Sequence, residues 1–170
     1  MSTSNRHETI VRIAEALRAR VDTLCTAFAS VTARQTTDRK VLVDLIVASQ
    51  DLPAAVVLLG PFDYEDGIHP GERLRTLNPG VLVTTEYDAD PDAGGGELWA
   101  LLDALDLCFM PLAARGDNPG KPIAVLGDQS GASRGIWVVP AGWNPIDAGD
   151  DRAAGVYNLM CWDPVMTRTD

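Results

Sequence analysis

The sequence predicts an α/β (α+β) fold: a single mixed, mainly antiparallel β-sheet with two main α-helices packed on it, plus an extended arm. The first observation is an uninterrupted apolar run over residues 54–59, entered through Pro53 and left through Gly60 and Pro61. A strand that is apolar on both sides has to be covered on both faces of its sheet. The second is a pair of amphipathic helix patterns, one before and one after this run. Several strand patterns near the C-terminus complete the prediction.

Length and composition indicate one domain over residues 1–170. A chain of 170 residues can bury a proper core, and 46% apolar with 22% charged residues excludes disorder as its global state. No apolar run approaches the roughly 18 residues of a membrane helix, and the first residues are polar with no apolar signal segment behind them. We therefore expect no membrane partner and a chain that stays in the compartment where it is made.

The formal net charge of −10 is unevenly distributed. Residues 1–50 carry seven Lys or Arg against five Asp or Glu, whereas residues 51–170 carry seven against nineteen. Groove-type binding of nucleic acid depends on basic residues that neutralise phosphates, so this composition argues against it. An acidic wall along which DNA passes without sticking is compatible with the same charge.

The three cysteines are widely spaced, and each lies among apolar neighbours: Cys25, Cys108 and Cys161. The sequence contains no C-x-x-C motif. This pattern predicts reduced cysteines buried in a core.

The first helix is predicted over residues 6–29. Asn5 and Glu8 have the spacing of a capping-box variant. The apolar residues recur at steps of three and four, which is typical of a helix with one buried face, and they are Ile10, Ile13, Leu17, Val21, Leu24 and Phe28.

A short strand over 31–35 follows the first helix. The segment 41–48 is apolar and rich in β-branched residues, so its sequence allows either a helix or a strand. We favour a short helix with Leu42, Leu45 and Ile46 facing inward.

The arm is predicted at about 62–79, where glycines and prolines stand among charged residues and indicate an exposed arm or long hairpin loop. Residues 81–87 alternate in polarity and predict a half-buried strand. The second main helix is predicted over 97–110, and Pro111 ends it.

The region 112–153 is predicted as a variable loop region that contains short strands at 123–126 and 135–139. A last strand is predicted at 155–162. No internal repeat is present.

None of the motifs with catalytic associations satisfies its requirements. Residues 131–135 match the G-x-S-x-G pattern of a nucleophile elbow, but a strand rather than a helix follows, and no histidine occurs after His69. The calcium-loop opening at 88–92 lacks the required glycine and glutamate, and the segment 116–121 has the wrong spacing for a P-loop. Asp103 and Asp106 are expected on a solvated helix face. We therefore predict no enzyme, no catalytic residues, no cofactor and no metal site.

The order of elements resembles the tail terminator, or tail completion, proteins of tailed bacteriophages, in the Mu-like and lambda-like branch. The resemblance rests on the helix at 6–29, the segment L-P-A-A-V-V-L-L-G at 52–60, the strand at 81–87, the helix at 97–109 and the closing V-Y-N-L-M-C-W at 156–162. It covers most of the chain in order.

The resemblance implies a sheet with helices on one side and a structural virion protein without catalysis. Such proteins form hexameric rings that cap the head-proximal end of the tail tube, end tail polymerisation and provide the joint to the head. The implied partners are copies of the same chain, the tail tube protein, the head-tail connector or neck protein, and a sheath protein if the tail is contractile. DNA would pass through the ring without specific binding. The implied location is the virion, after assembly in the host cytoplasm.

Four residues are candidates for subunit contacts: Tyr64, Ile68, Leu74 and Trp143. The first three make the predicted arm too apolar for a free loop. Trp143 lies in a segment rich in glycine and proline, where it is either an exposed aromatic suited to an interface or a ring folded back over the core.

Two alternatives stay open. The chain can be another phage neck or head-tail joining protein, or a non-catalytic bacterial binding module. A tube subunit fits less well, because tube subunits consist mostly of strands with one helix.

Overall fold

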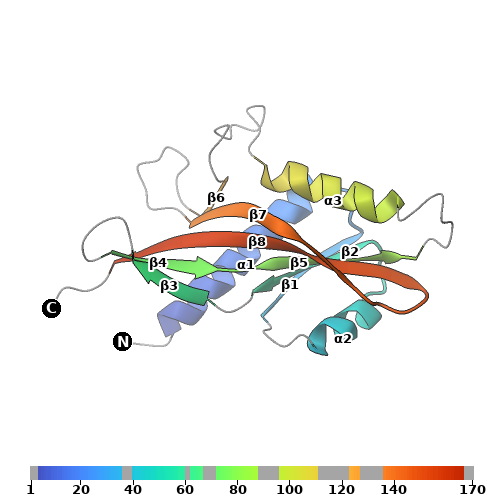
Figure 1. Cartoon of the computed structure of the whole chain (residues 1–170), viewed down its shortest axis with the longest axis horizontal. Coiled ribbons are helices and arrows are strands. Elements are labelled where there is room, and N and C mark those ends of the chain that lie inside the picture. The colour runs from blue at the N-terminus through green and yellow to red at the C-terminus, as the bar shows by residue number, and fades with distance from the viewer. Residues whose placement is uncertain are drawn as a thin grey trace.

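A computed structural model describes residues 4–35, 40–59, 62–66, 72–87, 96–110, 123–126 and 136–166. In these residues the chain is an α+β fold of three helices and one mixed sheet (Figure 1). The helices are α1 (Ser4–Leu24), α2 (Lys40–Ala48) and α3 (Gly96–Phe109). The strands are β1 (Ser30–Gln35), β2 (Ala54–Leu59), β3 (Phe62–Asp66), β4 (Glu72–Leu77), β5 (Gly80–Glu86), β6 (Ile123–Leu126), β7 (Ile136–Ile146) and β8 (Arg152–Met166).

The centre of the sheet is a long two-stranded ribbon. One edge of β8 pairs antiparallel with both β4 and β5, and the register runs without a shift from the pair Glu72 and Met166 to the pair Glu86 and Arg152. Pro79 lies between β4 and β5, and its carbonyl accepts a 2.8 Å hydrogen bond from the backbone N–H of Leu159. Strands β4 and β5 therefore pair with β8 as a single continuous strand would.

The other strands add to the two sides of this ribbon. On one side β2 pairs with β5 and β3 pairs with β4, while on the other side β7 pairs with β8 and β6 pairs with β7. All of these pairs are antiparallel. Strand β1 joins the outside of β2 in parallel, which makes the sheet mixed as predicted.

Strand β2 is buried on both faces, as its continuous apolar sequence predicts. Ala55, Val57 and Leu59 face one core, which they share with α1 and α3. Val56 and Leu58 face a second, smaller core with Ile46 of α2. We call these the α1/α3 core and the α2 core. Figure 1 shows α3 and α2 on opposite sides of the sheet. The expectation of a sheet with helices on one side therefore holds only for the two main helices, α1 and α3.

The prediction for α2 was correct in both type and orientation. Ile46 is fully buried, and Leu42 and Leu45 pack partly buried against the same core. The helix ends beside β8, where Arg152 donates hydrogen bonds to the carbonyl oxygens of Ile46 (2.7 Å) and Ser49 (2.6 Å). These carbonyls lie at or beyond the last turn of a helix, where intrahelical donors run out. Arg152 therefore caps α2 from a distant part of the chain.

The predicted end of the first helix was wrong. Helix α1 ends at Leu24 rather than at residue 29, and Leu24 is 38% exposed although it belongs to the predicted apolar stripe. Cys25 takes the buried position one turn after Val21, and Phe28 is buried in the connection to β1 instead of in the helix. The chain leaves the helix after Leu24, so Cys25 and Phe28 reach the core from the connection to β1 and not from a helical stripe.

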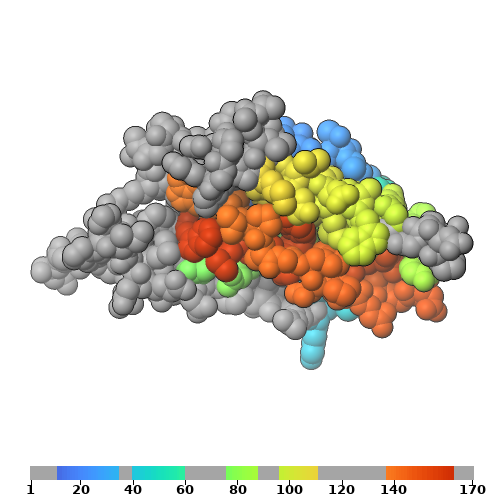
Figure 2. Space-filling view, turned by 45° about the horizontal axis from the view of Figure 1, so that its top comes forward, coloured from blue at the N-terminus to red at the C-terminus, as the bar shows by residue number. Residues whose placement is uncertain are grey.

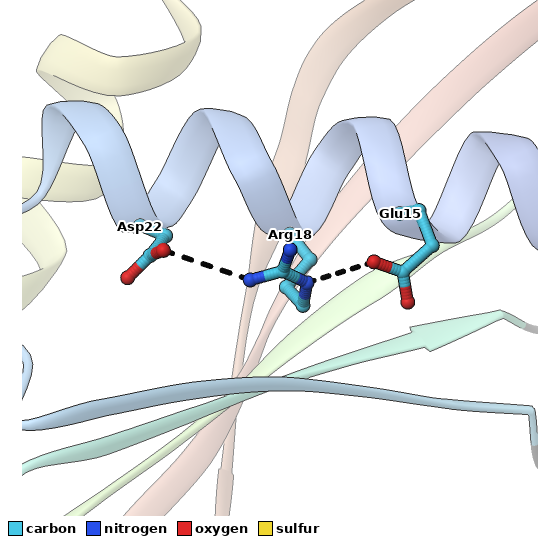
Figure 3. Close-up of polar contacts among 3 residues, drawn as sticks. All are labelled: Glu15, Arg18 and Asp22. Atoms are coloured by element: carbon cyan, nitrogen blue, oxygen red, sulfur yellow. Dashed lines mark hydrogen bonds and ion pairs between the residues drawn. The ribbon is translucent and has the colours of Figure 1, made fainter.

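The outer face of α1 carries a short ion-pair chain (Figure 3). The Arg18 guanidinium lies between Glu15, at 2.8 Å, and Asp22, at 3.6 Å. The hydrogen bond from Arg18 to Glu15, and the charge of that carboxylate, raise the pKa of Arg18. Because all three side chains are solvated, the contribution to stability is small. This face is an ordinary solvated helix surface.

Strand β5 was predicted as half-buried and is instead buried along both faces up to Thr85. Val81 and Val83 enter the α1/α3 core, and Leu82 enters the α2 core. The alternation of apolar and polar residues was misleading because Thr84 and Thr85 are buried as well.

The segment predicted as an arm or long loop is a hairpin whose two strands, β3 and β4, belong to the sheet. Leu77, at the end of β4, is 1% exposed and part of the α1/α3 core. The segment is therefore no free loop, since β4 is fixed between β3 and β8.

Strand β7 is longer than predicted, because it continues through Pro140 to Ile146. A bulge lies between Pro140 and Gly142. Val138 and Trp143 both contact the α1/α3 core although they are five residues apart. Alternation alone would place them on opposite faces, so the extra residue of the bulge turns Trp143 back onto the core.

Trp143 packs against a glycine that leaves room for it. A Cβ at Gly155 would come within 2.2 Å and 2.4 Å of two carbons of the indole ring and within 2.7 Å of the Asn144 carbonyl oxygen. Real Cβ atoms do not approach so closely, so any larger residue at 155 has to displace the ring or the strand.

We predict that Gly155→Ala lowers the free energy of unfolding by about 1–3 kcal/mol, as for other overpacked sites. Urea denaturation followed by tryptophan fluorescence measures the change. Gly96→Ala is the matched control, because no heavy atom lies within 4 Å of a Cβ there, and its stability should be unchanged or slightly higher. Equal stabilities for Gly155→Ala and the wild type would contradict this account of Trp143.

Candidate interaction surfaces

The described side chains contain no group of three or more His, Cys, Asp or Glu that could hold a metal ion. The three cysteines are buried and form no disulfide, as predicted. The G-x-S-x-G, calcium-loop and P-loop segments tested in the sequence, and His69, lie outside the described residues. No helix in the described ranges is both long and apolar enough to cross a membrane.

One partly buried polar pair was not predicted. Asp106 was expected to be solvated, but it accepts a hydrogen bond from the Tyr157 hydroxyl, while Asp103 is exposed as expected. Tyr157 is 4% exposed, and its ring stacks on Phe109 at 6.2 Å between centroids. The hydrogen bond and the ring stacking connect α3 to β8 across the α1/α3 core. One signal for this pair is present in the sequence: Tyr157 is the second residue of the predicted closing strand V-Y-N-L-M-C-W, in which side chains alternate between the two faces.

The environment of Tyr157 favours the protonated phenol. Burial is the larger cause and the hydrogen bond to Asp106 the next, and together they raise the pKa of Tyr157 far above its ordinary value. A raised pKa in the folded state means that Tyr157 contributes its full stability below the pKa of an unfolded tyrosine, about 10. That contribution declines as the pH rises above this value.

We predict that the Tyr157 phenol ionises only as the protein unfolds in alkali. The absorbance of tyrosinate, recorded as wild type minus Tyr157→Phe during a pH titration, should therefore rise together with the loss of circular dichroism. The substitution should also lower stability at pH 7 by about 1–2 kcal/mol through the lost hydrogen bond to a charged group. An ionisation near pH 10 with the fold intact would refute the raised pKa.

The four residues predicted for subunit contacts do not form one cluster. Tyr64 lies in β3 opposite Arg75, and Leu74 lies in β4 opposite Glu65, so both belong to the same hairpin. Ile68 lies outside the described residues. Trp143 lies in β7 opposite Tyr157, is partly buried and packs against the α1/α3 core. The ring folds back over the core, which was one of the two possibilities, and its role in a subunit contact stays a prediction.

A second surface lies on the sheet face that carries α2. The pairs Trp137 with Trp162 and Val139 with Met160 are directly opposite each other on β7 and β8. Val138 and Cys161, their neighbours in the chain, face the α1/α3 core. These four side chains therefore face the other side, where each is only partly buried. We call them the tryptophan face. Residues two apart in each strand, W-x-V and M-x-W, are the sequence signal that could have revealed it.

A third surface follows the outer side of α3. Its exposed large apolar side chains are Trp99 at 59%, Leu107 at 56% and Met110 at 46%, with Asp103 among them. Their spacing of eight and three residues places them on one side of the helix, opposite the buried Leu101, Leu105 and Cys108. We call them the α3 ridge. Figure 2 shows α3, in yellow, forming much of the visible surface beside β7, in orange. Exposed apolar residues gathered on one helix are typical of interaction surfaces.

No protein-family model matches the chain, and a search of curated proteins finds no match either.

Proposed function

We propose that this protein is a structural virion subunit that caps the head-proximal end of a bacteriophage tail tube as a ring, as tail terminator proteins do. The observation that carries the proposal is the order of elements on which the resemblance rests. The buried strand β2, the strand β5, the helix α3 and the closing strand β8 follow α1 along the chain in the predicted order. The resemblance implies a hexamer.

The distribution of charge and surface supports a role in assembly. The net charge is −10, and nineteen of the acids lie after residue 50. An acidic channel wall would repel the DNA backbone and let DNA pass. The tryptophan face and the α3 ridge offer two separate apolar surfaces, and a terminator has to contact both the tube below it and the connector above it. A sheath protein would be a further partner in a contractile tail.

We predict that the purified chain forms sixfold rings with the diameter of a tail tube. Negative-stain electron microscopy and light scattering would measure ring symmetry and mass. When the chain is added to polymerising tube protein of the same phage, tubes should become shorter and carry a ring at one end. Monomers at every concentration, together with tubes of unchanged length, would refute the proposal.

The alternatives give different results in the same experiments. A neck or joining protein would bind the head connector without shortening the tubes. A binding module would leave tubes unchanged, and its melting temperature would rise with a small-molecule ligand in a thermal-shift screen.

A further inference from the structure

We propose that the ring closes through its sheet: the outer edge of β3 in one subunit pairs with the outer edge of β6 in the next. This inference rests on the proposed ring and names the contact that builds it. The two edges lie on opposite sides of the subunit, as a head-to-tail contact requires.

A single row of pairs connects the two edges. Asp63 of β3 pairs with Thr76, Thr76 pairs with Trp162, Trp162 pairs with Trp137, and Trp137 pairs with Ala124 of β6. Among the described residues no further strand lies beyond β3 or β6 in this row. Within the described part of the chain, both ends of the row therefore present backbone groups to which another strand can add.

At the other end of the sheet, the outer edge of β7 is protected against pairing with a strand of another subunit. The N–H group of Leu159 points to Pro79 and therefore away from β7. Because N–H groups alternate sides along a strand, the N–H group of Gly155, four residues earlier in β8, also points away from β7. Their partners in β7 are Pro140 and Pro145, whose nitrogens therefore face the outer edge, where they offer no hydrogen. Prolines and bulges are the usual means of protecting an edge. On this side of the subunit, β6 is the edge without proline.

The direction of the strands agrees with a ring. Successive antiparallel pairs from β3 through β4, β8 and β7 leave β6 running in the same direction as β3. Rotation about an axis along the strands keeps that direction, so β3 and β6 of neighbouring subunits meet as a parallel pair. Such a contact joins two different edges and can close into a ring.

The charges of the two strands favour this pairing over pairing of like edges. Strand β3 reads F-D-Y-E-D and carries three acids, whereas β6 reads I-A-V-L and carries no charge. Two β3 strands side by side would bring like charges together, which is unfavourable. A neighbouring β6 creates no such repulsion.

Two proline variants test the contact. The alternation that starts from Leu159 turns the N–H groups of Tyr64 and Ala124 outward, away from β4 and β7. Tyr64→Pro and Ala124→Pro should each remove an outward donor and spare the internal ladders. We expect neither variant to form rings at ten times the concentration at which the wild type assembles. Mixed one to one, they should form dimers, because the intact β3 edge of one variant meets the intact β6 edge of the other.

Matched controls separate backbone pairing from loss of fold or side chain. Tyr64→Phe keeps both the N–H group and the aromatic ring, Ala124→Ser keeps the N–H group, and both variants should still form rings. Should a proline variant fail to fold, amide exchange of the wild type gives the answer, since exchange over 62–66 and 123–126 should slow at least tenfold on assembly. Rings formed by either folded proline variant, or unchanged exchange at both segments in assembled rings, would overturn the pairing but leave the proposed ring intact. A wild type that never assembles would overturn both.

Discussion

The antiparallel ribbon between β8 and the combined line of β4 and β5 is the constraint on which the rest of the structure depends. Every other strand adds directly or through one neighbour to this ribbon, and both cores form on its faces. Its register holds through Asn78 and Pro79, where β4 gives way to β5. If one strand of the ribbon slipped by one residue, its side chains would change faces along its whole length. Those that now enter the α1/α3 core would face the α2 core, and the reverse. The buried Val81 and Val83 on one face, and Leu82 on the other, fix the register against such a slip.

Much of the fold could be predicted because its strongest elements carry local signals. Strand β2 was identified from six apolar residues between Pro53 and Gly60, and α3 from leucines at helical spacing ended by Pro111. Both signals depend only on neighbours in the chain. The short helix α2 was harder, since β-branched residues favour a strand, yet Leu42, Leu45 and Ile46 pointed to the correct inner face.

The misses have tertiary causes. Nothing local shows that Pro140 can lie within a strand, because this depends on whether its nitrogen faces a neighbour or an open edge. Cys25 is buried in place of Leu24 because α1 ends at Leu24 and the connection to β1 begins there. Tyr64 and Leu74 lie in one hairpin, within the segment predicted as an arm, and their part in a subunit contact stays a prediction. Trp143 faces the core. The spacings W-x-V and M-x-W place each half of the tryptophan face on one side of its own strand, but the register between β7 and β8, which brings the two halves together, has no local signal.

The cap that Arg152 places on α2 has a consequence for how the protein opens. Nine residues are too few for a helix that is stable on its own, so α2 depends on the small core around Ile46 and on the guanidinium at its end. Arg152 is the first residue of β8 and follows the turn after β7, so a disturbance of that turn would loosen the cap of α2 together with the last pair of the central ribbon. Detachment of α2 would uncover Val56, Leu58 and Leu82 together while the other face stays packed. We therefore expect the face that carries α2 to open by local unfolding more readily than the face that carries α1 and α3.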